Sequence, residues 1–175
     1  DALAVGETYL DTFRYTAWDG VLPSNVATAT ITVTGVNDAP QAFPNQYTVS
    51  EDVQLTGANV ILDDTGSGAD RDLDHGDVLR MSQLAGMALT GNTPVVVTLA
   101  SGAKVTAIYN ASLGRYDGNF VYDPTTSAAL NALQVGQTGS DSFVYGVGDG
   151  LASSTATVNI TVRGANDAPV ATPNQ

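Results

Sequence analysis

The sequence predicts an all-β protein, an antiparallel β-sandwich repeated in a tandem array, and three observations support this fold class. Many short stretches alternate apolar with small or polar residues at a period of two, as half-buried strands do. Gly and Asp turn residues separate these stretches about every 8–12 residues, a spacing typical of sandwiches. Two blocks of sequence also occur twice in the same order.

The predicted strands follow one another along the chain with turns between them. DTFRYTAW and DSFVYGVG alternate and are rich in aromatic residues, and PVVVTLASGAKVTAIYN is typical of a hairpin centred on Ser101-Gly102. Only TSAALNAL, residues 126–133, favours a helix, and its length allows one or two turns. Strands are expected within 11–18, 27–35, 46–53, 54–62, 78–84, 94–110, 118–124, 141–148 and 155–164.

The repeated blocks define the domain organisation. LAVGETYLDTFRYTAWDG, from residue 3, returns as LQVGQTGSDSFVYGVGDG, from residue 133. ITVTGVNDAPQAFPNQ, from residue 31, returns as ITVRGANDAPVATPNQ, from residue 160. Self-similarity at a fixed period marks a tandem array. We therefore expect the C-terminal strands and linker of one repeat in 1–40, a complete repeat in 41–169, and the start of the next repeat in 170–175.

Composition excludes several classes of protein. The chain has 18 acidic and 6 basic residues and a net charge of −12, whereas phosphate neutralisation by a nucleic-acid binder requires Lys and Arg. The same charge disfavours an anionic membrane surface, and no apolar stretch is long enough to span a bilayer. The absence of cysteine excludes disulfides and thiolate metal sites. This composition is typical of a secreted bacterial β-protein, and the chain, which opens within a repeat, is expected to be a segment of a longer protein.

One stretch, DDTGSGADRDLDHGD at 63–77, concentrates six of the acidic residues. Carboxylates this close repel one another, and a divalent cation reverses that repulsion. An EF-hand is disfavoured because its sixth and twelfth positions, Gly and Glu, are occupied by His75 and Met81. The RTX nonapeptide is half matched, with Thr65 and Asp72 at positions that need Gly and a large apolar residue. A solvated acidic loop is the remaining alternative to a calcium site.

Sandwich topology predicts where this acidic loop lies. It joins the strands within 54–62 and 78–84, so it is expected at the same end as the incoming linker and the last hairpin turn. In DRDLDHGD, strand-like alternation would point three of the aspartates one way, while Gly76 would permit a tight turn. We therefore expect Ca²⁺ to be bound by Asp72, Asp74, Asp38 and Asp149, with Asp70, Asp77 and Asp64 as second choices.

The linker TVTGVNDAP, the following QYTVSEDV and the acidic loop together resemble the cadherin-like and VCBS-type repeats of giant bacterial RTX adhesins. The resemblance implies an Ig- or cadherin-like sandwich and calcium at the joints between repeats. The cadherin linker reads D-x-N-D-N-x-P, whose first Asp and second Asn are replaced here, so one or two ions per joint are expected. The resemblance assigns metal-binding roles to Asn37 and Asp38, to Asn166 and Asp167 at the outgoing linker, and to Glu51 on the side of the next repeat.

The expected function is that of a calcium-binding extender module of a secreted or surface-bound bacterial adhesin, with neighbouring repeats as its partners. Homophilic contacts or a host surface are further partners that the resemblance allows. The alternative is a lectin-like module that binds a carbohydrate or protein through 94–110 or 85–93. No catalytic arrangement is expected, because His75 is the single histidine and no Ser/His/Asp motif is present. The alternation of Tyr15, Trp18 and Tyr145 with Phe13 and Phe143 favours core or half-buried strand positions over a sugar-stacking surface.

Overall fold

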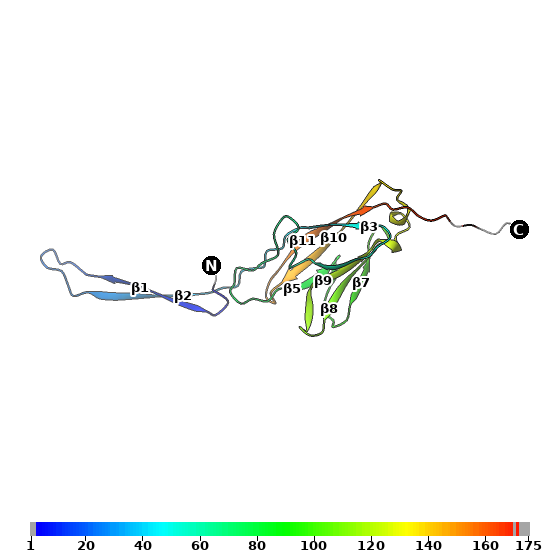
Figure 1. Cartoon of the computed structure of the whole chain (residues 1–175). Coiled ribbons are helices and arrows are strands. Elements are labelled where there is room, and N and C mark those ends of the chain that lie inside the picture. Colours follow the sequence, from blue (N-terminus) through cyan, green and yellow to red (C-terminus); the bar gives the residue numbers. More distant parts are fainter. Residues whose placement is uncertain (1–2, 170, 172–175) are drawn as a thin grey trace. The chain divides into compact units, whose positions relative to one another are not determined.

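The computed structural model describes residues 3–169 and 171, and almost all of its regular structure is β-strand (Figure 1). The prediction of an all-β, predominantly antiparallel sandwich is confirmed. The chain forms two compact units: Asp1–Asp38 with Asp72–Asp77, and Ala39–Arg71 with Val78–Gln175. No helix in the described residues is long and apolar enough to cross a membrane.

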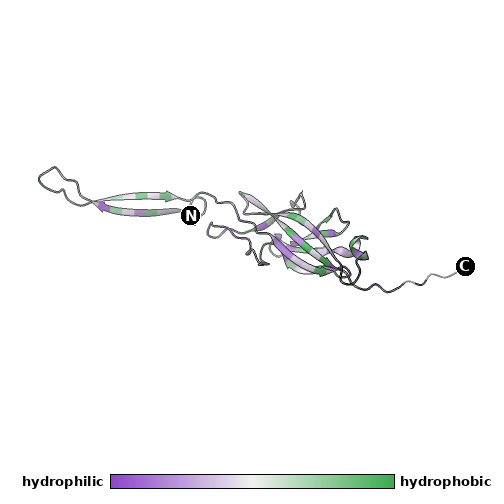
Figure 2. Cartoon of the chain, turned by 90° about the horizontal axis from the view of Figure 1, so that it is seen from above, coloured by the Kyte–Doolittle hydropathy of each residue, from purple (hydrophilic) through white to green (hydrophobic). Residues whose placement is uncertain are grey.

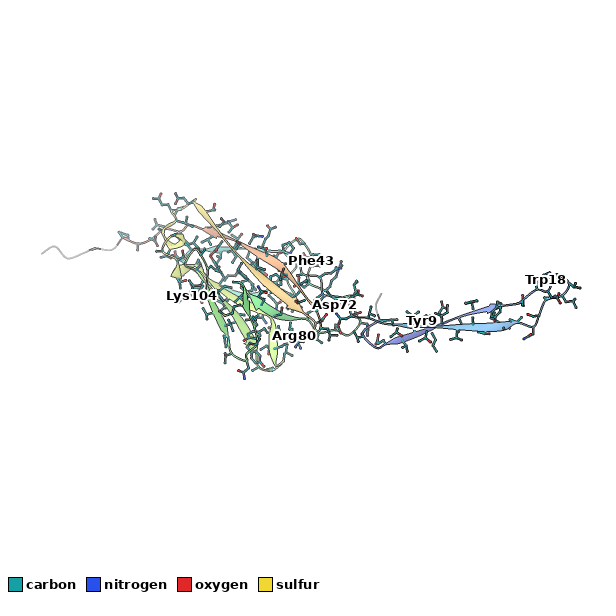
Figure 3. The ribbon with its side chains drawn as sticks, turned by 180° about the vertical axis from the view of Figure 1, so that it is seen from behind. Tyr9, Trp18, Phe43, Asp72, Arg80 and Lys104 are labelled. Atoms are coloured by element: carbon teal, nitrogen blue, oxygen red, sulfur yellow. The ribbon has the colours of Figure 1, made fainter. Side chains whose placement is uncertain are left out.

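The first unit contains a two-stranded antiparallel hairpin of β1 (Thr8–Tyr15) and β2 (Ala27–Thr34). Hydrophobic residues alternate with polar residues along both strands (Figure 2). All residues of β1 are exposed, as are most of β2, and Figure 3 shows the side chains of the hairpin standing free, including the labelled Tyr9 and Trp18. Tyr15 and Trp18 are 51% and 65% exposed, so the prediction of core or half-buried positions is wrong for them, whereas it is confirmed for Tyr145, which is fully buried. Tyr15 and Trp18 lack an opposing sheet to pack against.

The second unit is a sandwich of two sheets (Figure 1). The five-stranded sheet has the order β3-β11-β10-β5-β6 and the four-stranded sheet the order β4-β9-β8-β7. All neighbours are antiparallel except β3 and β11, which are parallel. The strands are β3 (Asn45–Ser50), β4 (Leu55–Asn59), β5 (Arg80–Leu84), β6 (Met87–Ala88), β7 (Val95–Thr98), β8 (Lys104–Asn110), β9 (Arg115–Asp123), β10 (Thr138–Gly148) and β11 (Ser153–Arg163).

The core lies between these sheets and follows from the period of two. In β9 every second residue is buried, which turns Tyr116, Phe120 and Tyr122 towards the other sheet. Phe120 meets Phe143 of β10 edge to face, with ring centroids 5.5 Å apart. Such aromatic pairs contribute about 0.5–1.5 kcal/mol beyond the area they bury. The core therefore joins the two sheets through the same alternation that predicted the strands.

Most element predictions are confirmed, although the strand expected within 11–18 lies at Thr8–Tyr15. Two further differences have local causes. The hairpin within 94–110 and the strand ending at Pro124 are present. The strand expected over 54–62 ends at Asn59, because the Asn59 Oδ1 accepts the N–H groups of Ile61 and Leu62 and turns the chain. The helix expected over 126–133 is wrong: two single 3₁₀ turns, Pro124–Thr126 and Leu130–Ala132, occupy this region. They do not join into one helix, because Ser127 ends the first turn in an extended conformation.

Candidate metal centre

The acidic loop connects β4 to β5, as predicted, and its residues belong to both units. Its first part remains with the sandwich up to Arg71, which pairs with Gln41 through two backbone hydrogen bonds. Its second part, Asp72–Asp77, belongs to the same compact unit as the linker that ends at Asp38. The acidic loop and the incoming linker are therefore brought together within one unit.

Asp74 makes the contact between them. Its side chain is only 4% exposed, and its Oδ2 accepts the backbone N–H of Asp38 at 2.8 Å. In the linker, the Asn37 Nδ2 donates to the Asp38 carbonyl oxygen at 2.7 Å. The prediction that Asp38 lies with the acidic loop is therefore confirmed for Asp74.

The segment from Asp72 to Asp77 is a turn, so the strand-like alternation predicted for its aspartates is wrong. The Asp74 N–H donates to Asp72 Oδ1 at 3.0 Å, and the Asp77 N–H approaches the Asp74 carbonyl oxygen at 3.4 Å. Gly76 adopts φ +92°, where a side chain would strain the backbone, so the predicted tight turn at this glycine is confirmed. Hydrogen bonds from Asp side chains to the following backbone compete with an extended conformation.

Two carboxylate oxygens of this turn are buried and make no hydrogen bond within the described residues: Asp72 Oδ2 and Asp74 Oδ1. Taking a carboxylate out of water is costly unless a hydrogen-bond donor or a cation replaces the lost solvation. Both oxygens belong to side chains two residues apart, on a loop that already uses its other oxygens to order the backbone. Oxygen donors of this kind are the ligands that calcium takes in proteins.

Asp70, a second-choice ligand, has a structural role in the sandwich. Its Oδ1 accepts the Phe43 N–H at 2.7 Å, and the Tyr145 hydroxyl donates to the carboxylate at 2.8–2.9 Å. Burial raises the pKa of Asp70 to about 6, although both hydrogen bonds act in the opposite direction. Asp70 thus ties the start of the second unit to β10.

Asp64 and Asp149 occupy tight turns. The exposed Asp64 accepts the N–H groups of Gly66 and Gly68, which lower the pKa of its carboxyl. Asp149 lies in the turn between β10 and β11, where its Oδ1 accepts the N–H groups of Leu151 and Ala152. The expected convergence of Asp149 with the acidic loop stays a prediction.

Glu51 lies at the outgoing linker, as expected, and is fully buried. Its Oε1 accepts the Ala165 N–H at 2.6 Å and its Oε2 the Leu133 N–H at 2.9 Å. A cavity of about 440 Å³ at this place is lined by residues 132–135 together with Ala165, Asn166 and Asp167. The Asn166 Nδ2 donates to the Asp167 carbonyl oxygen, which repeats the contact between Asn37 and Asp38. The Asn-Asp pairs of the two linkers therefore make the same side-chain-to-backbone hydrogen bond.

Two acidic residues that the sequence did not single out have structural roles. Asp63 accepts the Tyr47 hydroxyl and the Asn59 N–H, and so fixes the exit from β4. Asp141 accepts the hydroxyls of Ser101 and Tyr122 from the opposite sheet. The repetition of Asp141 as Asp11 in the two sequence blocks was the available signal for the second role.

The segment proposed for a lectin-like ligand borders a different cavity, of about 400 Å³. It is lined by residues of β5, β8 and β9 and of the segment after β6, among them Arg80, Leu89, Tyr109, Arg115 and Tyr116. Two of the six basic residues of the chain thus lie on one cavity. Basic and aromatic groups of this kind could contact an acidic or sugar-like ligand, but no carboxylate arrangement for a metal-bound glycan is formed by these lining residues.

A scan of the chain against models of protein families finds no match, and a search of curated proteins finds no match either.

Proposed function

We propose that this chain is a calcium-binding extender module of a large bacterial adhesin, secreted or held at the cell surface. The observation that carries this proposal is a pair of buried carboxylate oxygens, Asp72 Oδ2 and Asp74 Oδ1, that make no hydrogen bond to any described residue. A surface loop that served only solubility would leave these oxygens in water. The sequence resemblance to cadherin-like and VCBS-type repeats supplies the adhesin context.

The ion would act on the linker through Asp74. This side chain already holds the Asp38 backbone, so a cation on its second oxygen would fix the loop and the linker together. Two like charges about 4 Å apart repel by about 4 kcal/mol at an intermediate dielectric constant, and a divalent ion converts that repulsion into attraction. Asp72 and Asp74 are the proposed ligands, with Asn37, Asp38 and Asp77 of the same unit as further oxygen donors.

The outgoing linker supports the same function at the next joint. Glu51 anchors it through Ala165, and Asn166 donates to Asp167 as Asn37 does to Asp38 in the incoming linker. An acidic loop supplied by a following repeat would complete this joint. Neighbouring repeats are thus the proposed partners, and calcium at each joint would resist bending and project a distal adhesive domain.

Extracellular conditions suit a weak site. Extracellular modules bind calcium with dissociation constants of about 10⁻⁴–10⁻³ M. The chain would be ordered outside the cell and looser in the low calcium of the cytosol, which would favour its secretion.

Calcium titration with and without Asp74→Asn tests the proposal. At about 100-fold excess over the dissociation constant, binding should stabilise the fold by about 2.7 kcal/mol, raise the melting temperature, and be reversed by a chelator. Asp74→Asn should remove most of the calorimetric signal and the temperature shift. The matched control is Asp64→Asn, which alters an exposed turn carboxylate in the same loop and should leave both responses intact.

Small-angle scattering distinguishes an extender from a lectin-like module. An extender becomes longer and stiffer as calcium is added, whereas a lectin shows glycan binding that depends on its exposed aromatic residues. If calcium changes neither melting nor shape, or if Asp64→Asn removes the response as fully as Asp74→Asn does, the proposed site is wrong.

A further inference from the structure

The β1–β2 hairpin has one apolar and one polar face. Residues that are opposite each other in the register share a face, so Tyr9, Phe13 and Tyr15 lie on the same side as Ile31 and Val33. These five side chains, here called the apolar face, are 38–60% exposed. The opposite face carries mainly threonines. A large exposed apolar surface of this kind marks an interaction site.

The complete repeat shows what covers such a face. Phe143 and Tyr145 of β10 correspond to Phe13 and Tyr15, and β10–β11 has the equivalent register, with Phe143 opposite Val158 and Tyr145 opposite Ala156. Phe143 is 4% exposed and Tyr145 is fully buried. The covering layer is the four-stranded sheet β4-β9-β8-β7 of the same repeat.

The two hairpins also differ in whether their outer strand edges are paired with another strand. β11 pairs with β3 in parallel, and β10 pairs with β5 in antiparallel orientation. Among the described residues, β1 and β2 pair only with each other. Their outer edges therefore present backbone N–H and C=O groups that a further strand can pair with.

One carboxylate, that of Asp11, lies on the apolar face, and its counterpart Asp141 in the complete repeat indicates what kind of partner covers it. The Asp141 Oδ1 accepts the following backbone N–H, and its Oδ2 accepts the hydroxyls of Ser101 and Tyr122 from the opposite sheet. Asp11 uses its Oδ1 in the same way, at 2.8 Å from the Thr12 nitrogen. In the complete repeat these two hydroxyls come from the layer formed by the four-stranded sheet. A partner with the equivalents of Ser101 and Tyr122 would offer the same two donors to Asp11.

We propose that the β1–β2 hairpin docks the remaining strands of another sandwich of this same repeat, with a sequence like that of residues 41–130. A strand like β3 pairs in parallel with the edge of β2, and a strand like β5 pairs with the edge of β1. A sheet like β4-β9-β8-β7 covers the apolar face and donates two hydroxyls to Asp11. This inference does not depend on calcium binding.

A tandem fusion tests the proposal with the full chain. A copy of residues 41–130 placed directly before residue 1 restores the spacing of the repeat, because Leu133 corresponds to Leu3. The amides of Phe13, Tyr15 and Ile31 should exchange with solvent at least 100-fold more slowly in the fusion than in the unfused chain. A second cooperative melting transition should accompany this protection. Exchange as fast as in the unfused chain overturns the proposal.

Paired variants separate docking from general misfolding. Phe13→Asp on the apolar face should remove the added protection and the second transition, whereas Thr30→Asp on the polar face should preserve both. The complete repeat should melt unchanged in all variants, which shows that the rest of the chain is folded. Concentration-dependent dimers or binding to anionic lipid vesicles, persisting in the fusion and lost in Phe13→Asp, would assign the face to another partner and overturn the proposal.

Discussion

The hairpins β1–β2 and β10–β11 have related sequences and the same pairing, yet one is open to solvent and the other lies at the centre of a core. Phe13 is 54% exposed and its counterpart Phe143 is 4% exposed. The turns agree as well, since Asp19 and Asp149 each accept the N–H groups of the residues two and three positions further on. Local sequence therefore determines the hairpin, whereas burial depends on strands that come from elsewhere.

Substitutions at the equivalent phenylalanines, Phe143 and Phe13, should show the largest difference in the free energy of unfolding. Phe143→Ala should lower the free energy of unfolding of the complete repeat by about 3–5 kcal/mol, because it leaves a cavity against Phe120. Phe13→Ala removes no buried contact with that repeat and should change its unfolding by less than about 0.5 kcal/mol. Urea unfolding followed by tyrosine fluorescence measures both values. Equal losses would show that the hairpins are not in different environments.

A smaller difference is expected at the paired aspartates. Asp141→Ala leaves the hydroxyls of Ser101 and Tyr122 without their acceptor and should cost about 1–3 kcal/mol. Asp11→Ala, on the open hairpin, should have almost no effect on the same unfolding transition. Thermal and urea denaturation of the two variants provides the comparison. A neutral Asp141→Ala would mean that the carboxylate does not join the sheets.

The smallest effect concerns the pH dependence of the open turn. The N–H groups of Leu22 and Val21 lower the pKa of the Asp19 carboxyl below its usual value of 3.8. A lowered pKa in the folded hairpin stabilises the turn above pH 3.8, and this contribution is lost as the pH falls through the folded pKa. At neutral pH, Asp19→Ala should speed amide exchange at Leu22.

A chemical-shift titration of the same two proteins gives the corresponding control. As the pH is lowered, the amide chemical shifts of Val21 and Leu22 should change with the protonation of the Asp19 carboxyl in the original chain. In Asp19→Ala they should show no such transition. Identical titrations would exclude Asp19 as the cap of this turn.

Sequence reasoning succeeded where a local pattern was sufficient. Alternation located the strands, and the position of the acidic loop between two strands predicted its meeting with Asp38. It failed where a side chain changed the path of the backbone, as when Asn59 ended β4 and the Asp72 carboxylate formed a turn. It also missed the use of Asp70, because only the folded sandwich brings Phe43 and Tyr145 to that side chain.

The sequence by itself determined the repeat, the strands, their facing pattern and the concentration of acidic residues in one loop. These properties depend on side-chain periodicity and on neighbours a few positions apart. Only the tertiary structure decided which apolar faces are covered and which carboxylate oxygens are buried without a hydrogen bond. Both depend on atoms distant in the chain, since solvation is lost only when other segments pack against a group.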